Sequence, residues 1–526
     1  MTTYDLGEAA TLLRSGEMKL IELDDDQSVV LARRDDTYYA FGSQCTHYGG
    51  PLEQGVLNGH TVICPWHHAC FDIRTGVRQE PPALDPVTSY PVTVEGGRVW
   101  LQLEPAEPAA MASIADDETY IIVGGGAAGE AAAEELRRTG FAGKIILLSA
   151  AATPPVDRPN LSKQYMAGEA DPDWIPLRSK AWYAEHDIDL RLETPVTSVD
   201  TAAHTVTTDN DVLQYHKLLL ATGSHPRVLS NVPGIDLDDI FTLRHQADAD
   251  RIIARVDENT RVVIVGGSFI GMEVAASLGQ RGASVTVVDV VSAPFEPILG
   301  ADVGRFWQRL HESNGVTFRL DTSVARFHED NGRVSAVELE DGTRLMADLV
   351  VLGVGVTPAT DFLSSSDIAI NPDDQSVRVD HHLHTSAADV YAAGDIARYP
   401  LANGDTQRIE HWRVAQQHGM IAARNMLGQL DTVTAHVPFF WTAQWGTRMR
   451  YVGFAADWDN IVYRGDVEKG EFIAFYLKDG QLQAAAGVGH DAEMAALEFV
   501  LQHNLALTTQ EMQNADFDLV RHVSTG

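Results

Sequence analysis

Two stretches of this 526-residue chain follow the same plan, with an apolar strand, a glycine-rich turn and a helix. The first is TYIIVGGGAAGEAAAEELRRTG from residue 119, and the second is RVVIVGGSFIGMEVAASLGQRG from residue 261. Glycines at such a turn let the backbone approach a pyrophosphate, whose charge is met by the helix amino terminus. A glycine motif alone is weak evidence, but here strand, spacing and helix agree twice. The sequence therefore predicts two Rossmann-like α/β folds, each binding one nucleotide.

The first turn carries glycines at the three fingerprint positions, Gly124, Gly126 and Gly129. About twenty residues further on, an acidic side chain normally accepts hydrogen bonds from a ribose. The strand KIILLS instead ends at Ser149 and Ala150. The usual ribose contact is therefore not expected from this strand.

The second turn departs from the fingerprint at its middle position, since it reads Gly266, Ser268 and Gly271. The serine Cβ narrows the approach of a pyrophosphate, while the hydroxyl could hydrogen bond a phosphate. Asp289 ends the next strand eighteen residues after Gly271, where a carboxylate accepts both ribose hydroxyls and repels a 2′-phosphate. No arginine follows it in VVSAPF, so we expect NADH to be preferred over NADPH. Gly355, in GVGVTPAT, is expected at the same site.

All three cysteines of the chain, Cys45, Cys64 and Cys70, fall within 26 residues, which indicates a metal site instead of a disulfide framework. Cys45-Thr-His47 and Cys64-Pro-Trp-His67 each offer one thiolate and one imidazole. A tetrahedral zinc site accepts the same four ligands. Zinc loops, however, usually pair like ligands, whereas a Rieske cluster takes two cysteines on one iron and two histidines on the other. The sequence therefore favours a Rieske [2Fe–2S] cluster, with Cys70 as a core residue.

The segments around these ligands, CTHYGGPL and CPWHHACFDIRTG, resemble the two cluster loops of Rieske-type ferredoxins. Short β-rich runs separated by turns extend over about the first hundred residues, as in a small antiparallel β domain. Respiratory Rieske proteins have a bridging cysteine in each loop and hydroxyl donors to the cluster sulfur. This chain has Gly50 and Trp66 at the bridge positions and Ala69 and Phe71 at the donor positions. Fewer donors predict a midpoint potential near the lower end of the Rieske range of about −150 to +300 mV.

A third group of motifs resembles the flavin-dependent pyridine-nucleotide reductases of the ferredoxin reductase and apoptosis-inducing factor branch. The motifs are PPVDRPNLSKQYM, ATG at 221–223 and VYAAGD at 390–395. The resemblance implies FAD in the first nucleotide fold, held by Arg158, Lys163, Thr222, Gly223 and Asp395. Lys163 would also supply a positive charge beside the flavin, because reduced flavin carries negative charge.

The same resemblance supplies two further candidate catalytic residues. Glu273 occupies the family's GxE position and could pair with Lys163, although an ordinary carboxylate on a helix surface fits the sequence equally well. Trp412, with Glu410, lies in RIEHWRVAQQHG, a segment that brings a tryptophan to the flavin in that family. Buried aromatic packing is an equally good explanation of Trp412. The candidate catalytic set is Lys163, Glu273 and Trp412.

Two other kinds of redox chemistry are disfavoured by the residues present. No cysteine follows Cys70, which excludes the thiol mechanisms of disulfide reductases and peroxidases of this superfold. Asp380, His381, His382 and His384 offer the histidines and the carboxylate of a mononuclear iron site. They stand directly before TSAADVYAAGD, where relatives place an exposed strand and turn. We therefore assign these four residues to the surface.

The 74 acidic residues outnumber the 39 basic ones, which gives a formal net charge of −35. Such a charge repels nucleic acid and anionic membranes, and no stretch approaches the ~18 uninterrupted apolar residues of a membrane helix. The amino-terminal segment lacks the basic and apolar regions of a secretory signal. We expect a cytoplasmic protein with no nucleic-acid or membrane partner. The charge serves either solubility or the docking of a basic redox partner.

The sequence thus predicts a multidomain chain that combines an all-β domain, two glutathione-reductase-type α/β folds and an α+β carboxy-terminal domain. The expected parts are a Rieske domain (1–104), a linker (105–118), an FAD domain in two parts (119–240 and 359–430), an inserted NAD domain (241–358) and a reductase or interface domain (431–526). Phe439, Phe440 and Trp441 of the last domain could back the flavin. The order resembles the Rieske-fused branch of the apoptosis-inducing factor-like reductases.

That resemblance implies an NADH:acceptor oxidoreductase. NADH would reduce FAD by two electrons, and the cluster would pass electrons singly to a protein acceptor such as a terminal oxygenase, a ferredoxin or a cytochrome. Two alternatives remain, an NADH-sensing or signalling protein and an oxidase that passes electrons directly to oxygen.

Overall fold

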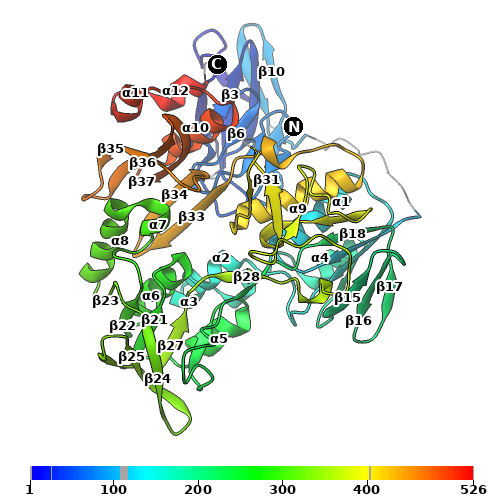
Figure 1. Ribbon diagram of the computed structural model, residues 1–526. Helices are drawn as coiled ribbons and strands as arrows, with labels where there is room; N and C mark the ends of the chain where they lie inside the picture. The colour runs from blue at the N-terminus through cyan, green and yellow to red at the C-terminus, as the bar shows by residue number, and fades with distance from the viewer. Residues whose placement is uncertain (1–2, 25–26, 107–116, 402–403, 525–526) are drawn as a thin grey trace. The chain divides into compact units, whose positions relative to one another are not determined.

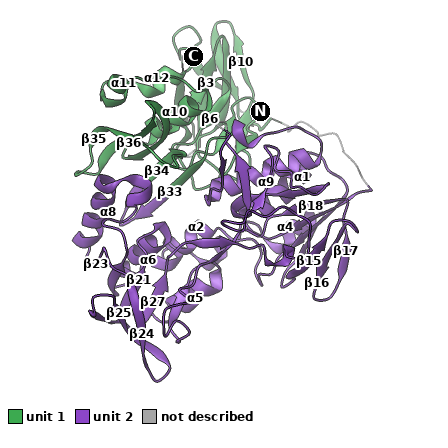
Figure 2. Ribbon diagram, in the orientation of Figure 1, with its two compact units in different colours: residues 1–111, 436–441, 449–526 green, residues 112–435, 442–448 purple. Residues whose placement is uncertain are grey.

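The computed structural model describes residues 3–24, 27–106, 117–401 and 404–524. Its chain forms two compact units (Figure 2). The first contains residues 1–111, 436–441 and 449–526, and the second contains residues 112–435 and 442–448. Most of the predicted linker, residues 107–116, lies outside the described residues.

The amino-terminal part of the first unit is an all-β domain of three antiparallel sheets, as the sequence predicted (Figure 1). The sheet orders are β1-β11-β10, β2-β3-β4-β9 and β5-β6-β7-β8. The strands are β1 (Thr3–Glu8), β2 (Met18–Glu22), β3 (Ser28–Arg34), β4 (Thr37–Gly42), β5 (Val56–Asn58), β6 (Thr61–Ile63), β7 (Cys70–Asp72), β8 (Arg78–Glu80), β9 (Ser89–Tyr90), β10 (Val92–Glu95) and β11 (Arg98–Gln102). The sheet β5–β8 supports the two cysteine loops, one before β5 and one between β6 and β7.

The carboxy-terminal part of the first unit combines a sheet in the order β33-β34-β37-β36-β35 with three helices. The elements are β33 (Phe439–Gln444), β34 (Thr447–Gly453), β35 (Asn460–Asp466), β36 (Glu471–Lys478), β37 (Gln481–Val488), α10 (Asp491–Gln502), α11 (Thr509–Gln513) and α12 (Leu519–Ser524). Val56, Ile63 and Cys70 of the β domain belong to the same hydrophobic cluster as Phe439 and Met494 of this part. The two ends of the chain therefore share one core.

The second unit contains two five-stranded parallel sheets that differ in one edge strand, which comes last along the chain in the first sheet (β30) and first along the chain in the second (β20). One is β14-β13-β12-β18-β30 and the other is β23-β22-β21-β27-β20. Their strands are β12 (Thr119–Val123), β13 (Lys144–Leu148), β14 (Ile188–Arg191), β18 (Lys217–Leu220) and β30 (Val390–Ala392), then β20 (Ile240–Thr242), β21 (Arg261–Val265), β22 (Ser284–Val288), β23 (Thr317–Arg319) and β27 (Leu349–Leu352). The central strands β12 and β21 are continuous apolar runs because a parallel sheet is covered on both faces. Both predicted Rossmann-like folds are confirmed.

Each central strand leads through its glycine turn into a helix, α1 (Ala127–Arg138) or α6 (Phe269–Gln280). The antiparallel pair of β19 (Ser224–Pro226) and β28 (Val356–Pro358) carries the chain between the two folds. The other helices are α2 (Arg158–Leu161), α3 (Gln164–Ala167), α4 (Lys180–Glu185), α5 (Gln246–Ile253), α7 (Glu296–Leu299), α8 (Ala301–Ser313) and α9 (Trp412–Met426). Smaller sheets are formed by β15 (Val196–Asp200), β16 (Thr205–Thr208) and β17 (Val212–Gln214), by β24 (Val324–Asp330), β25 (Arg333–Leu339) and β26 (Arg344–Met346), and by β29 (Val377–Arg378), β31 (Ala397–Pro400) and β32 (Thr406–Gln407).

Among the described residues, no helix combines the length and the apolar character that crossing a membrane requires. The longest, α9, has 15 residues, whereas a membrane helix needs about 20.

Candidate functional site

The two cysteine loops of the first unit have matching backbone turns. The Cys45 N–H donates to the carbonyl of Gly50 at 2.8 Å, and the Cys64 N–H donates to the carbonyl of Ala69 at 2.9 Å. In both loops the residue before that carbonyl donates its own N–H back to the cysteine carbonyl. Each cysteine is therefore fixed at the start of a closed turn, with its histidine two or three positions further on.

These turns bring the four predicted metal ligands together in like pairs. The Nδ1 atoms of His47 and His67 lie 3.1 Å apart, and the thiols of Cys45 and Cys64 are hydrogen bonded. That bond raises the pKa of Cys45 and lowers the pKa of Cys64. Burial lowers the pKa of His47 to about 3, which keeps its ring in the neutral form that binds metal. The donor set fits a cluster with two cysteines on one iron and two histidines on the other.

The disulfide of respiratory Rieske proteins is absent from this chain, because Gly50 and Trp66 occupy its two positions. A Cβ added at Gly50 would lie 2.7 Å from the Sγ of Cys64 and 3.3 Å from the ring of Trp66. Ala69 and Phe71 are fully buried and apolar, so neither side chain can donate to cluster sulfur. Cys70 is buried in the core, as predicted, with its sulfur 3.4 Å from the carbonyl of His68. The low potential expected from missing donors stays a prediction.

Aromatic side chains of the carboxy-terminal part lie against the histidines of the second loop. The ring of Trp441 lies 4.5 Å from that of His67, and Phe439 stacks on His68 at 4.0 Å. Phe439 and Trp441 thus lie against the second cysteine loop, because β33 packs on that loop. That Phe439, Phe440 and Trp441 back the flavin stays a prediction.

Two polar contacts tie the second cysteine loop to the carboxy-terminal part. Arg450, on β34, donates its Nε–H to the carbonyls of Pro65 and Trp66, both at 3.1 Å. His68 and Glu498, both buried, lie 2.6 Å apart between Nδ1 and Oε2. The loop that holds Cys64 is therefore supported from outside the β domain.

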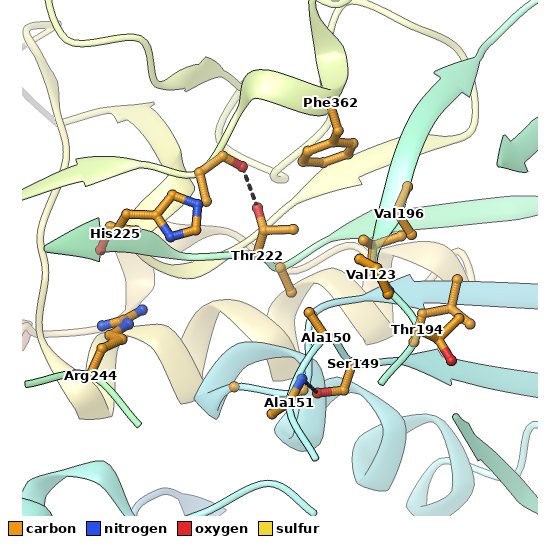
Figure 3. A pocket seen from close by; sticks show the side chains of 18 of the residues that line it. Val123, Ser149, Ala150, Ala151, Thr194, Val196, Thr222, His225, Arg244 and Phe362 are labelled. Carbon is orange, nitrogen blue, oxygen red and sulfur yellow. Dashed lines mark hydrogen bonds between the residues drawn. The ribbon is translucent and has the colours of Figure 1, made fainter. Parts of the chain in front are cut away.

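A cavity of 530 Å³ opens at the carboxyl ends of β12, β13 and β18 in the second unit (Figure 3). Ligands of open α/β sheets bind at this edge. Figure 3 shows His225 and Arg244 on one side of it and Thr194 and Val196 on the other. The lining residues include the predicted Gly124, Gly126, Arg158 and Thr222.

The cavity is electropositive because two guanidinium groups lie close together. Burial and the neighbouring Arg244 lower the pKa of Arg158 to about 9. Arg244 lies 3.6 Å from Asp395, which also accepts a hydrogen bond from Ser224 at 2.9 Å. Arg158 has no carboxylate within ion-pair distance in the described ranges of the chain. A bound anion such as a pyrophosphate would remove this repulsion, so the residues present fit a dinucleotide.

The remaining residues predicted for the first nucleotide lie around this cavity without all lining it. Gly129 lies in the first turn of α1, and Gly223 lies beside Arg244. The hydroxyl of Thr222 donates to the carbonyl of Ala359 at 2.8 Å, drawn as a dashed line in Figure 3. Ser149 and Ala150 line the cavity at the end of β13. The place of the usual ribose carboxylate is therefore taken by a small polar side chain.

The second glycine turn uses its serine as a helix cap. Ser268 precedes α6, accepts a hydrogen bond from the Gly271 N–H at 3.4 Å and donates to the carbonyl of Gly353 at 2.7 Å. Its single proton is therefore committed to the fold, and donation to a phosphate, which the sequence left open, is not available in this arrangement. Asp289 accepts hydrogen bonds from the backbone of Gly267 and Val290 at the end of β22.

Lys163 and Glu273 form a buried ion pair, with Nζ 2.8 Å from Oε2 and side-chain exposures of 9% and 5%. The pairing predicted from the GxE position is confirmed, and the alternative of a surface carboxylate is wrong. The Lys163 ammonium also donates to the carbonyl of Pro159 at 3.0 Å. A fixed positive charge thus stands at the start of α3, where the sequence predicted it.

Comparison with protein families accounts for nearly the whole chain. Residues 118–419 match the pyridine nucleotide-disulphide oxidoreductase family, residues 2–91 match the Rieske [2Fe-2S] domain, and residues 439–523 match the reductase C-terminal family. This chain belongs to the pyridine nucleotide-disulphide oxidoreductase family. The Rieske match decides against the zinc alternative.

The oxidoreductase resembles both branches that its motifs suggested. It is 36% identical to apoptosis-inducing factor 3 of Homo sapiens over 530 residues, covering 98% of this chain and 86% of the human protein. It is 33% identical to putidaredoxin reductase CamA of Pseudomonas putida, covering 68% of this chain and 85% of that protein. The crystal structure of the covalent putidaredoxin reductase–putidaredoxin complex matches with a TM-score of 0.75 at 29% identity, covering 78% of this chain and 100% of that one.

The predicted cofactors and fold class of this oxidoreductase are thereby confirmed. It carries FAD, uses NADH and holds a Rieske [2Fe–2S] cluster. An all-β Rieske domain precedes two Rossmann-like folds and a carboxy-terminal reductase domain.

Trp412 and its neighbour Glu410 lie at the start of α9. Trp412 is half-buried and makes no aromatic ring contact with another described residue, so packing against other rings does not explain it. Glu410 forms an ion pair with Arg408 at 2.6 Å. The predicted place of Trp412 beside the flavin stays a prediction.

The histidine-rich turn before β30 is held by backbone contacts. Asp380 accepts hydrogen bonds from the N–H groups of His382 and His384, and the His382 ring contacts the carbonyl of Asp431. Within the described part of the oxidoreductase, no group of three or more His, Cys, Asp or Glu side chains could hold a single metal ion. His381 and His382 lie in a turn, and His384 forms a β-bridge with Tyr391.

Sequence reasoning missed several residues of the first nucleotide site. Arg244, His225 and Ser224 line the cavity, and none of them lies in a glycine motif. Ser224 follows ATG directly, so its position next to a known motif was an available signal. Arg244, in TLRH, offers no comparable signal, because it follows β20, a strand of the other nucleotide fold.

Proposed function

We propose that this oxidoreductase takes electrons from NADH through FAD and passes them singly, through its own Rieske cluster, to a protein acceptor. The observation that carries the proposal is that one chain holds both the paired cysteines and histidines and the arginine-lined dinucleotide cavity. When bound, FAD accepts two electrons as a hydride and releases them one at a time to a cluster that carries one. A protein acceptor is supported because one similar structure is a complex of such a reductase with putidaredoxin.

The proposed ligands of the cluster are Cys45 and Cys64 on one iron and His47 and His67 on the other. The like pairs already face each other across the two loops. Because His47 is kept neutral by burial, no proton has to leave its ring before metal binds.

Two residue sets are proposed to hold the nucleotides. In the first fold, Arg158 balances the charge of the FAD pyrophosphate. The hydroxyl of Thr222 holds the cavity lining in place through its hydrogen bond to the carbonyl of Ala359. In the second fold, Asp289 accepts the ribose hydroxyls of NADH, and Ser268 shapes the turn as a helix cap. The complete sets are Gly124, Gly126, Gly129, Arg158, Lys163, Thr222, Gly223 and Asp395 for FAD, and Gly266, Ser268, Gly271, Asp289 and Gly355 for NADH.

Lys163, Glu273 and Trp412 are the proposed catalytic residues. Lys163 would hold a positive charge where negative charge develops on reduction, and such preorganised charges contribute strongly to catalysis. Glu273 keeps that ammonium in place through the buried ion pair. Trp412 is proposed to meet the flavin or nicotinamide from the start of α9.

The domain boundaries and the cellular location are proposed as the sequence predicts them. The Rieske domain would end near residue 104, the NAD domain would occupy 241–358 between the halves of the FAD domain, and the last domain would begin near 431. A cytoplasmic location is supported by the small number of cysteines, three in the chain, which are too few for the disulfide framework of many secreted proteins.

The acceptor is proposed to be a basic protein, such as an oxygenase component, a ferredoxin or a cytochrome with a positive docking face. Residues 1–104 carry 15 acidic and 7 basic side chains. Complementary charge raises association rates and orients partners. Docking should therefore weaken as salt increases.

A second candidate function is NADH sensing or signalling. The observation that favours it is the similarity to human apoptosis-inducing factor 3, which extends over 98% of this chain. The two functions differ in turnover: a relay reduces its acceptor repeatedly, whereas a sensor is reduced by NADH and then holds that state.

Anaerobic titration of the full-length protein with NADH tests both functions. We expect bleaching of the flavin absorbance and a reduced-Rieske signal by electron paramagnetic resonance, followed by steady reduction of cytochrome c. Cys64→Ser should keep the flavin bleaching and lose cytochrome c reduction. Cys70→Ala, at the nearby cysteine outside the ligand set, is the matched control and should behave as the wild type. Full-rate cytochrome c reduction by Cys64→Ser would show that the cluster is not on the pathway, and bleaching without turnover would support sensing.

A further inference from the structure

The Glu273 carboxylate is surrounded by hydrogen-bond donors on both oxygens. Its Oε2 accepts from the Lys163 ammonium at 2.8 Å and from the Ser162 hydroxyl at 2.5 Å. Its Oε1 accepts from the Thr442 hydroxyl at 2.8 Å. Thr442 is fully buried, in the segment 442–448 that belongs to the second unit. The ion pair described above is therefore one end of a larger polar assembly.

Beyond Thr442, the hydrogen bonds continue through three more side chains. The Gln444 amide Nε2 donates to the Thr442 Oγ at 2.9 Å, and the Gln444 Oε1 lies 2.7 Å from the Nε2 of His311. The indole N–H of Trp445 donates to the Nδ1 of His311 at 3.3 Å. Gln444 and His311 are both almost completely buried. We call these residues, together with Thr442, Glu273 and its two other donors, the Glu273 network.

The proton positions in the network follow from the number of hydrogen bonds that each group can donate and accept. Thr442 has one hydroxyl proton and gives it to Glu273, so it must accept from the amide of Gln444. The amide oxygen of Gln444 then requires a proton on Nε2 of His311, which leaves Nδ1 free to accept from the indole. Burial lowers the pKa of His311 to about 4, in agreement with this neutral ring. Every donor from Trp445 to Thr442 therefore points toward Glu273.

Aligned donors that end on a carboxylate stabilise its charged form and polarise one another. They also fix its orientation, because both oxygens are already engaged. An ionised and oriented Glu273 in turn holds the Lys163 ammonium in one place. The far end of the chain, at His311 on α8, touches neither Lys163 nor the cavity described above.

The network has a specific structural support at Trp445. This residue has a positive φ of 53°, which is uncommon for a bulky side chain. Its indole packs so closely on α6 that a Cβ at Gly279 would lie 2.7 Å from the ring. The positive φ at Trp445 and at Gly446 is the geometry of a two-residue hairpin turn between β33 and β34, and this turn holds the indole N–H where it donates to His311.

We propose that His311 and Gln444 are positioning residues for the reduction of FAD by NADH, acting through Thr442 on the carboxylate that holds Lys163. The inference rests on the proposed function, in which Lys163 supplies positive charge at the flavin. It adds that His311, in the second nucleotide fold, positions the Lys163 ammonium without contacting it, through the turn at 442–445.

Thr442 offers an isosteric test. Thr442→Val removes the hydroxyl and keeps the shape, whereas Thr442→Ser keeps the hydroxyl. Rapid-mixing measurements should show flavin reduction by saturating NADH about tenfold slower in Thr442→Val, since side chains in one network couple by about one tenfold step. The flavin midpoint potential should be more negative by about 30 mV, the value of a tenfold change for a two-electron couple. Thr442→Ser should restore both properties, and an unchanged rate and potential in Thr442→Val would overturn the proposal.

The role of the remote residues is tested with a double-mutant cycle. His311→Phe should slow flavin reduction and shift the flavin potential in the same direction as Thr442→Val, and the double variant should be no worse than either single variant. Trp307→Phe, which alters a buried aromatic residue on the same helix outside the network, controls for loss of packing. Additive effects, or a His311→Phe variant that matches the Trp307→Phe control, would overturn the proposal.

The thermal unfolding temperatures of the four proteins in this cycle provide a readout that needs no turnover. Coupling between Thr442 and His311 should also appear there as non-additivity, and additive shifts would count against the network. Because the flavin potential and the unfolding temperature do not depend on the acceptor, they still report on the network if the cytochrome c test rejects the relay.

Discussion

Replacement of Arg450 by methionine should loosen the Rieske loop from outside the Rieske domain. Arg450 is 3% exposed, and its Nε–H donates to the carbonyls of Pro65 and Trp66, the residues directly after Cys64. A Nη1 atom also pairs with Asp491, whose side chain is 38% exposed. Methionine retains an apolar stem of similar length, so the packing changes little while the donors and the charge are lost.

The cost follows from these contacts. A hydrogen bond from a charged donor contributes about 1.5–3 kcal/mol, while the half-exposed Asp491 can turn to water and contributes little. Removal of the buried guanidinium also removes the cost of its desolvation, which offsets part of the free energy lost with the hydrogen bonds. We expect the free energy of unfolding of the first unit to fall by about 3 kcal/mol. This corresponds to a decrease of roughly 6–12 °C in its unfolding temperature, at about 2–4 °C per kcal/mol for a unit of roughly 150–250 residues. The cluster potential should fall by a few tens of millivolts, because a positive charge near Cys64 is removed and 59 mV is tenfold for one electron.

Differential scanning calorimetry and a redox titration monitored by electron paramagnetic resonance measure both effects. Arg448→Met removes the same charge from an exposed position on the same strand and should change stability by less than about 0.5 kcal/mol. Arg450→Lys should change the cluster potential less than Arg450→Met does, because lysine keeps the positive charge. It should still lower the free energy of unfolding in part, because lysine lacks the planar donor group. The reasoning is refuted if Arg450→Met and Arg448→Met give the same unfolding temperature and the same cluster potential.

Three further predictions concern the second unit. Lys163→Met should slow flavin reduction by NADH about a hundredfold in rapid-mixing experiments, since loss of one preorganised donor costs that much in other enzymes; a change below threefold would remove Lys163 from the catalytic set. Asp289→Asn should lower kcat/KM for NADH about tenfold and that for NADPH less, because a charged acceptor for ribose hydroxyls is lost and repulsion of a 2′-phosphate is relieved; a wild type that prefers NADPH would contradict the assignment. The folded protein keeps His311 neutral down to a pKa of about 4, whereas the unfolded chain takes up that proton near pH 6.5. The corresponding stability is present above pH 6.5 and is lost as pH falls toward 4, so urea unfolding of wild type and His311→Phe should converge by up to about 3 kcal/mol across that window.

The sequence predicted those parts of the fold and sites that depend on local patterns. The glycine turns, the apolar strands beside them and the two cysteine loops are each short segments whose spacing carries the geometry. The ion pair between Lys163 and Glu273 was predicted only because a family motif named both positions. Ser268 as a helix cap was also predictable, since serine is favoured directly before a helix.

The features that the sequence did not predict join segments far apart in the chain. The contact of Trp441 with His67 was not predicted, because aromatic residues carry no sign of which partner they face and this contact depends on how two distant segments pack. Arg244 lines the dinucleotide cavity of the first fold although it follows β20, a strand of the second fold. The chain of hydrogen bonds to His311 depends on a tight turn at Trp445 whose backbone no local pattern indicated.

The hydrophobic core shared by Val56, Ile63 and Cys70 with residues from Val437 to Val523 also bears on how the protein is made. During synthesis, the Rieske segment leaves the ribosome long before the strands and helices that complete its core, and amino-terminal domains normally fold first. Here one face of that segment has to stay uncovered while both nucleotide folds are being made. Stable insertion of iron and sulfide should therefore follow release of the finished chain, and chaperones that bind exposed apolar strands have their longest opportunity on this segment.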